Sequence, residues 1–114
     1  MSAARQKGTA FETSLLPALR AIWPHAERRA LQGAKDKGDF LLPSNLFAIE
    51  AKNCARFDLP KWLAEAKAEA ANAGATIGVV VSKRRGKTDP MEQYIHMTVA
   101  DFLYLAKLAE AAHR

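Results

Sequence analysis

The sequence predicts a single α/β domain in which helices flank a central mixed β-sheet. The first observation is an apolar run at residues 75–82, rich in valine and isoleucine, which is typical of a central strand buried on both faces. The second is helical spacing of apolar residues in three separate segments. The third is a set of short strand-like runs between those segments. The predicted order is helix, three strands, helix, two strands, helix, which indicates a layered α/β architecture.

The length and composition predict one soluble globular domain over residues 1–114. The chain is 49% hydrophobic and 25% charged, a globular balance for a chain of this size. Its longest uncharged stretch, residues 70–82, is too short to cross a bilayer, and the first residues lack the apolar run of a signal peptide. Cys54 is the only cysteine, which excludes an intrachain disulfide. We therefore expect a cytoplasmic protein with no membrane partner.

The charge balance favours a polyanionic partner such as DNA. Seventeen Lys and Arg residues against twelve Asp and Glu residues give a net charge of +5. Clustered basic residues are candidates for phosphate contacts, although a solvated loop is the ordinary alternative for any one of them. These candidates are Arg5, Lys7, Lys35, Lys37, Arg84, Arg85 and Lys87.

Capping patterns set the expected helix boundaries. A first helix over residues 9–22 would begin at a capping box formed by Thr9 and Glu12. A second helix would end at Gly74, because glycine is favoured just after a helix. A third would begin at Thr98 as N-cap.

The expected strands lie between these helices. Turn-forming residues between the second and third strands predict that these two form a hairpin. The five expected strands cover residues 25–31, 39–42, 46–52, 75–82 and 94–97.

Three residues of the second and third strands form a candidate catalytic constellation. Glu50 and Lys52 would point to the same face of an extended strand, about 7 Å apart. Their neighbours Ile49 and Ala51 would point into the core. If the carboxylate of Asp39 approaches that of Glu50, the pair makes a hard oxygen site suited to Mg²⁺. A lysine beside such a site can orient a water molecule.

Each of these residues also has an ordinary structural interpretation. Glu50 and Lys52 could be a solvent-facing pair, Asp39 a turn residue, and Glu12 the capping partner of Thr9. Taken together in a basic chain, they favour metal-dependent hydrolysis of a phosphodiester.

The ordered set resembles the PD-(D/E)xK nuclease superfamily. The resemblance rests on the segment RQKGTAFE at residues 5–12, on Gly38-Asp39 and on IEAK at residues 49–52. Within the superfamily, the chain resembles the archaeal-type Holliday junction resolvases and the resolvase-like nucleases of bacteriophages. The resemblance implies a restriction-endonuclease-like core and a Mg²⁺-dependent DNA endonuclease acting on branched DNA in a bacterial cell or phage-infected host.

The resemblance also implies roles for individual residues. Asp39 and Glu50 would ligate Mg²⁺, or Mn²⁺ as a substitute, with help from the backbone carbonyl of Ala51. Glu12 would complete the acidic cluster, and Lys52 would position the attacking water. By the same resemblance, the N-terminal basic residues would contact phosphates near the scissile bond.

Two departures from the superfamily pattern concern the segment before Asp39. Gly38 stands where the superfamily's name has a proline, and residues 33–37 carry no hydroxyl residue.

Resolution of a four-way junction would need two symmetric nicks, which a homodimer built on the first or last helix would supply. Two other functions remain open. One is a phage-type nuclease of other DNA specificity, and the other is a non-catalytic DNA-binding or regulatory protein on the same fold.

Overall fold

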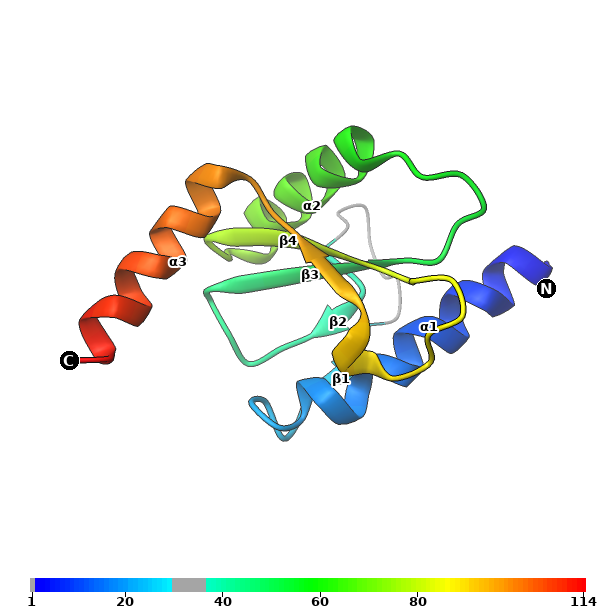
Figure 1. Ribbon diagram of the computed structural model, residues 1–114, viewed down its shortest axis with the longest axis horizontal. Helices are drawn as coiled ribbons and strands as arrows, with labels where there is room; N and C mark the ends of the chain where they lie inside the picture. The colour runs from blue at the N-terminus through cyan, green and yellow to red at the C-terminus, as the bar shows by residue number, and fades with distance from the viewer. Residues whose placement is uncertain (1, 30–36) are drawn as a thin grey trace.

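The computed structural model describes residues 2–29 and 37–114, which form three α-helices, one short 3₁₀ helix and five strands (Figure 1). The predicted α/β class is confirmed. The elements are α1 (Ala3–Leu19), β1 (Glu27–Arg28), β2 (Phe40–Leu41), β3 (Phe47–Lys52), α2 (Leu59–Ala73), β4 (Ile77–Ser82), the short 3₁₀ helix η1 (Pro90–Glu92), β5 (Tyr94–His96) and α3 (Val99–Ala112).

The main sheet has the strand order β3-β4-β5 and is mixed. β3 and β4 run parallel, with Phe47 opposite Ile77 and Lys52 opposite Ser82, and β5 is antiparallel to β4. A parallel pair needs a crossover connection, which α2 provides. All six residues of β4 are buried, as the apolar run predicts.

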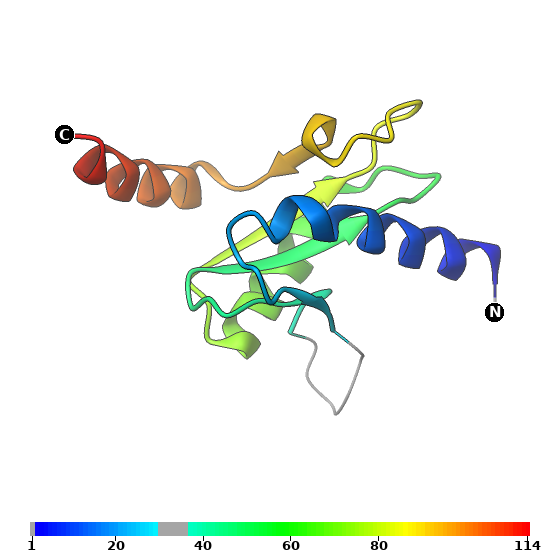
Figure 2. The same ribbon diagram turned by 90° about the horizontal axis from the view of Figure 1, so that it is seen from below.

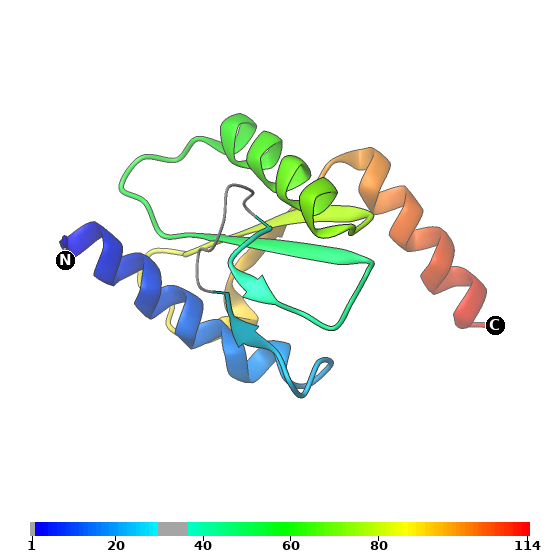
Figure 3. The same ribbon diagram turned by 180° about the vertical axis from the view of Figure 1, so that it is seen from behind.

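The predicted hairpin between the second and third strands is wrong. β2 pairs with β1 in a separate two-stranded antiparallel sheet beside α1 (Figure 3). The segment before β2 still touches β3, because the Asp39 amide donates to the carbonyl of Ile49 at 3.1 Å. In the connection between β2 and β3, the Ser44 hydroxyl accepts from the amides of Leu46 and Phe47 just before β3 begins.

The two faces of the main sheet are covered by different helices (Figure 2). On one face, Phe11 and Leu15 of α1 pack in the same apolar cluster as Ile49 and Val79. On the other face, residues of α2 pack on Val80. The alternation of side chains along β3 and β4 therefore divides the core into two layers.

α1 differs from its prediction at both ends. It begins after Ser2, whose hydroxyl accepts from the Arg5 amide, and it ends at Leu19. Thr9 is thus inside the helix, and the predicted capping box with Glu12 is wrong. The Glu12 side chain takes no part in the cap of α1, and it lies in the site described below.

The predicted caps of the other two helices agree with the structure. Gly74 ends α2 in the left-handed conformation, with φ 72°. The Thr98 hydroxyl accepts from the amide of Asp101 at the start of α3. Among the described residues, none of the helices has the length and apolar character needed to cross a membrane.

Gly78 gives a test of how closely α2 packs on β4. A methyl group at Gly78 would collide with the backbone carbonyl of Ala66, whereas one at Gly8 in α1 would meet nothing within 4 Å. Gly78→Ala should lower the free energy of unfolding by about 2 kcal/mol through overpacking. Gly8→Ala, the matched control, should raise it by about 0.5–1 kcal/mol, because alanine is the better helix former. Urea denaturation measures both, and equal effects would contradict the close packing.

Candidate active site

The four predicted catalytic residues line one groove together with Lys7. They come from α1, from the segment before β2 and from β3, so the fold brings together residues that are distant in sequence. The groove has a volume of about 590 Å³. Its polar or charged lining residues are Lys7, Glu12, Asp39, Glu50, Lys52 and Asn53, with Cys54 beside them.

The strand geometry predicted for β3 is confirmed. Glu50 and Lys52 lie on one face, where Lys52 Nζ is 3.4 Å from Glu50 Oε1. Ile49 and Ala51 point the other way into the apolar cluster under α1. The pleat of a single buried strand thus separates the polar residues from the core.

Backbone hydrogen bonds hold Asp39 against β3. The Asp39 amide donates to the Ile49 carbonyl, and the Ala51 amide donates to Asp39 Oδ2 at 2.8 Å. The preceding Gly38 has φ 98°, a conformation that favours glycine. Proline cannot adopt this φ, since its ring fixes φ near −65°. The glycine in place of proline is therefore required by this backbone path.

Asp39 carries the strongest electrostatic perturbation at the site. Burial and the negative charge of Glu50 raise the pKa of Asp39 to about 7, with a further contribution from Glu12. The hydrogen bond from Ala51 and the positive charge of Lys52 act in the opposite direction. Like-charged carboxylates held together in this way resist full ionisation until a cation joins them.

Lys52 is held as a cation by two carboxylates. Its Nζ lies 3.1 Å from Glu65 Oε2 on α2, in addition to its contact with Glu50. Burial disfavours the charge, but the hydrogen bond to Glu65 and the charges of both glutamates outweigh it and raise the pKa of Lys52. A protonated lysine in this position can orient a water molecule or stabilise negative charge, but it cannot accept a proton.

Glu50 has a free oxygen in a buried position. The residue is only 7% exposed, and Oε2 has no hydrogen-bond partner within the described part of the chain. A buried, unpaired carboxylate oxygen is costly unless it is paired or coordinates a metal. Such an oxygen suits a hard cation such as Mg²⁺. Among the described residues, the group of three acidic side chains close enough to share a metal ion combines Glu50 with Glu65 and Glu69, and not with the predicted Asp39 and Glu12.

Glu12 contributes from the middle of α1. Its Oε1 accepts a hydrogen bond from Arg28 Nε at 3.1 Å, so β1 supplies a partner for it. The contact between Arg28 and Glu12 links the two-stranded sheet to the groove.

Sequence reasoning did not identify Glu65 and Glu69 of α2 as members of the site. Carboxylate oxygens of Glu50, Glu65 and Glu69 all lie within 4.8 Å of one another, close enough to bind a metal ion. The available signal was their spacing of four residues, which places them on the same face of a helix. The sequence does not show that this face of α2 lies over β3, because that depends on how α2 crosses between β3 and β4.

The predicted DNA-binding residues of the N-terminal half lie in different places relative to the groove. Lys7 lines it, and Arg5 is exposed on the first turns of α1. Lys37 is exposed, two residues before Asp39. Lys35 lies outside the described residues.

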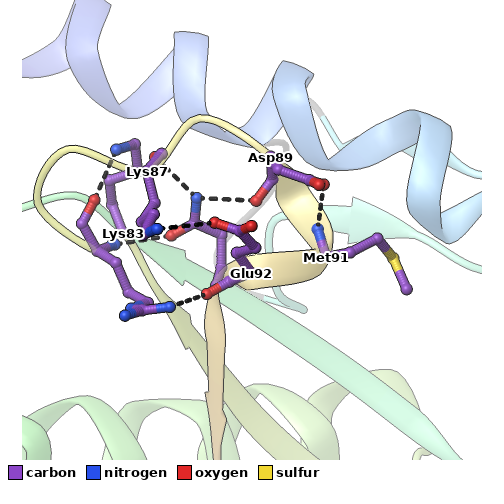
Figure 4. A network of polar contacts seen from close by, with 7 residues as sticks. Lys83, Lys87, Asp89, Met91 and Glu92 are labelled. Atoms are coloured by element: carbon purple, nitrogen blue, oxygen red, sulfur yellow. Dashed lines mark hydrogen bonds and ion pairs between the residues drawn. The ribbon is translucent and has the colours of Figure 1, made fainter.

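The basic loop after β4 begins beside the groove, because the Lys83 amide donates to the Lys52 carbonyl at 2.9 Å. Figure 4 shows that polar contacts tie this loop to η1, including an ion pair of 3.3 Å between Lys87 and Glu92. The guanidinium of Arg84 donates to the Glu92 carbonyl and stacks on Tyr94.

Two of the three loop cations predicted to bind DNA, Arg84 and Lys87, therefore have intramolecular partners. Arg85 is exposed.

No protein-family model, curated protein or solved structure matches this chain.

The raised pKa of Asp39 predicts a pH-dependent stability in metal-free protein. Asp39 holds its proton more tightly when folded, with a pKa of about 7 against an ordinary 3.8. The resulting stabilisation is complete below about pH 4 and is lost as the pH rises through 7. Asp39→Asn removes this titration, so it should stabilise the protein by about 2 kcal/mol more at pH 8 than at pH 5.

Denaturant unfolding in EDTA at both pH values measures this difference. Asp58→Asn is the matched control, because its carboxyl is exposed and outside the groove. Equal effects of Asp39→Asn at pH 5 and pH 8 would contradict the proposed charge repulsion.

Proposed function

We propose that this protein is a Mg²⁺-dependent DNA endonuclease of the PD-(D/E)xK kind, with a restriction-endonuclease-like core. The observation that carries the proposal is the convergence of Glu12, Asp39, Glu50 and Lys52 on one groove. A chance arrangement of capping, turn and surface residues would not place them together. The net charge of +5 supports a polyanionic substrate.

Asp39 and Glu50 are the residues that would hold the metal, with Glu12 completing the acidic set. When bound, Mg²⁺ would lower the pKa of a water molecule and stabilise charge on a phosphoryl oxygen. Oε2 of Glu50, which has no hydrogen-bond partner in the described part of the chain, supports this assignment, as does the repulsion that helps to raise the pKa of Asp39. A cation at the groove would relieve both unfavourable features.

The other polar groups of the groove have complementary tasks. Lys52 is fixed by two carboxylates and can donate a hydrogen bond to the attacking water or to the phosphate. Lys7 lies in the same groove and can contact a phosphate next to the scissile one. Arg5, Lys37 and Arg85 are exposed basic residues that can extend the contact along the DNA backbone.

We propose branched DNA, and in particular a four-way junction, as the substrate. This assignment rests on the resemblance to the Holliday junction resolvases. A nuclease acting on other forms of DNA would use the same residues in the same roles, and the experiment below separates the two.

A non-catalytic DNA-binding protein is the second candidate. The observation that favours it is the internal pairing of the site, since Arg28 neutralises Glu12, and Lys52 neutralises Glu50 and Glu65. Such a network could serve structure alone. In that case the basic residues would bind DNA without a metal-dependent reaction.

The test is cleavage of labelled four-way junction, flap and linear duplex DNA in Mg²⁺ and in EDTA. Asp39→Asn, Glu50→Gln and Lys52→Ala should each lower kcat by at least about 100-fold, because each removes a group that acts in the reaction. Glu27→Gln is the matched control, since Glu27 is an exposed carboxylate outside the groove.

Paired, metal-dependent nicks in the junction alone would support a resolvase. Cutting of all three substrates would support a nuclease of broader specificity. Binding of DNA without cleavage of any substrate would refute the enzymatic proposal in favour of the binding protein.

Glu65 should act as a positioning residue for Lys52, a prediction that depends on the nuclease proposal. Glu65→Ala removes the shorter of the two contacts to Lys52 Nζ and should lower kcat about tenfold while leaving KM unchanged. Glu65→Gln retains an acceptor oxygen and should recover part of the loss. An effect on KM alone, or on DNA binding in EDTA, would argue against positioning.

A further inference from the structure

Glu69 lies on the side of α2 that faces the main sheet. The buried residues of this helix are Trp62, Ala66, Glu69 and Ala70. Trp62 and Ala66 pack on Val80 of β4, and the helical repeat of 3.6 residues places Glu69 on the same side as these two. Glu69 is only 5% exposed. A carboxylate in an otherwise apolar stripe is unfavourable unless a positive charge or a hydrogen bond compensates for its burial.

Glu50 reaches the same space from β3. It lies opposite Val80 in the strand register, on the face of the sheet that α2 covers (Figure 3). One carboxylate oxygen from each of Glu50, Glu65 and Glu69 lies within 4.8 Å of the other two. Three carboxylates from a strand and from the helix packed on it therefore converge on one point.

Lys52 satisfies only part of this cluster. Its Nζ lies 3.4 Å from Glu50 Oε1 and 3.1 Å from Glu65 Oε2. Oε2 of Glu50 is buried without a hydrogen-bond partner among the described residues, and Glu50 as a whole is 7% exposed. The partner that such an oxygen lacks is a metal ion or a proton. This orphaned oxygen is an observation separate from the closeness of the three carboxylates, and it points to a ligand.

The spacing of the three oxygens suits Ca²⁺ better than Mg²⁺. Ca²⁺ binds oxygens at about 2.3–2.6 Å, so two oxygens on opposite sides of it lie up to about 5 Å apart. Mg²⁺ binds at about 2.0–2.1 Å, and the same oxygens would have to approach to about 4.2 Å. The side chain of Glu65 is 35% exposed, so the cluster is open to solvent on one side. An ion thus has an entry path and can keep water ligands.

We propose that Glu50, Glu65 and Glu69 bind a divalent cation, with Ca²⁺ as the best-fitting ion, that fastens α2 to β3. An ion held by both elements exists only in the folded chain, so its binding free energy stabilises the fold. Glu65 and Glu69 lie outside the set of described residues that line the groove, and Glu50 is common to both sites. The proposal does not depend on the nuclease function.

The test is isothermal titration calorimetry with Ca²⁺ on the full chain carrying Asp39→Asn. This substitution removes a charged groove ligand, so Ca²⁺ that still binds reports on the proposed site. One equivalent should bind. Adding Glu69→Gln should lower the affinity at least about tenfold, because a neutral amide replaces a charged ligand. Glu110→Gln in the same background is the matched control. It makes the same change at an exposed helical position outside the cluster and should leave the affinity unchanged.

A second measurement on the unmodified chain decides the matter if a variant does not fold. Amide hydrogen exchange in α2 should be at least about tenfold slower in Ca²⁺ than in EDTA, whereas exchange in α3, which supplies no ligand, should not change. A cation held by the groove alone would leave α2 unchanged.

No binding of Ca²⁺ to Asp39→Asn, an equal affinity with and without Glu69→Gln, or unchanged exchange in α2 would each overturn the proposal. Glu69-dependent binding of Ca²⁺ by a protein that cleaves no DNA would support this site and contradict only the nuclease function.

Discussion

The parallel pairing of β3 with β4 is the constraint on which the other elements depend. Two parallel strands cannot be joined by a tight turn, so the chain must cross over through α2. This crossover lays α2 on one face of the sheet, where Gly78 allows its backbone to approach. It also brings Glu65 over Lys52 and places the loop after β4 beside the end of β3. The groove is therefore built at the edge where the two parallel strands end.

The carboxylates gathered in the groove lower the stability of the folded state locally. Burial and repulsion raise the pKa of Asp39, and one oxygen of Glu50 is buried without a hydrogen-bond partner among residues 2–29 and 37–114. A protein selected for stability alone would dispense with such groups, because charged groups are buried at a cost. Arg28 and Lys52 offset part of that cost, and the remainder is what a bound cation would relieve. The proposed metal site and the local instability thus have the same physical origin.

The sequence predicted the features that depend on local periodicity and missed those that depend on long-range packing. The apolar run of β4, the caps at Gly74 and Thr98, and the shared face of Glu50 and Lys52 follow from local rules. The start of α1 was misplaced because Thr9 and Glu12 imitate a capping box. In the structure, Glu12 lies within α1 and lines the groove, and it does not cap a helix end.

Local sequence patterns could not predict which strand pairs with β2 or which carboxylate of α2 pairs with Lys52. β2 pairs with β1 and not with β3, although the turn residues between β2 and β3 are those of a hairpin. Glu65 has no local motif, and its role becomes visible only with α2 packed on the sheet. α3 shows the same limit of prediction from local patterns. Its apolar residues predicted a buried helix face, yet none of them is fully buried and Leu105 is only partly buried against the main cluster. The periodicity thus indicates burial without identifying the surface that provides it.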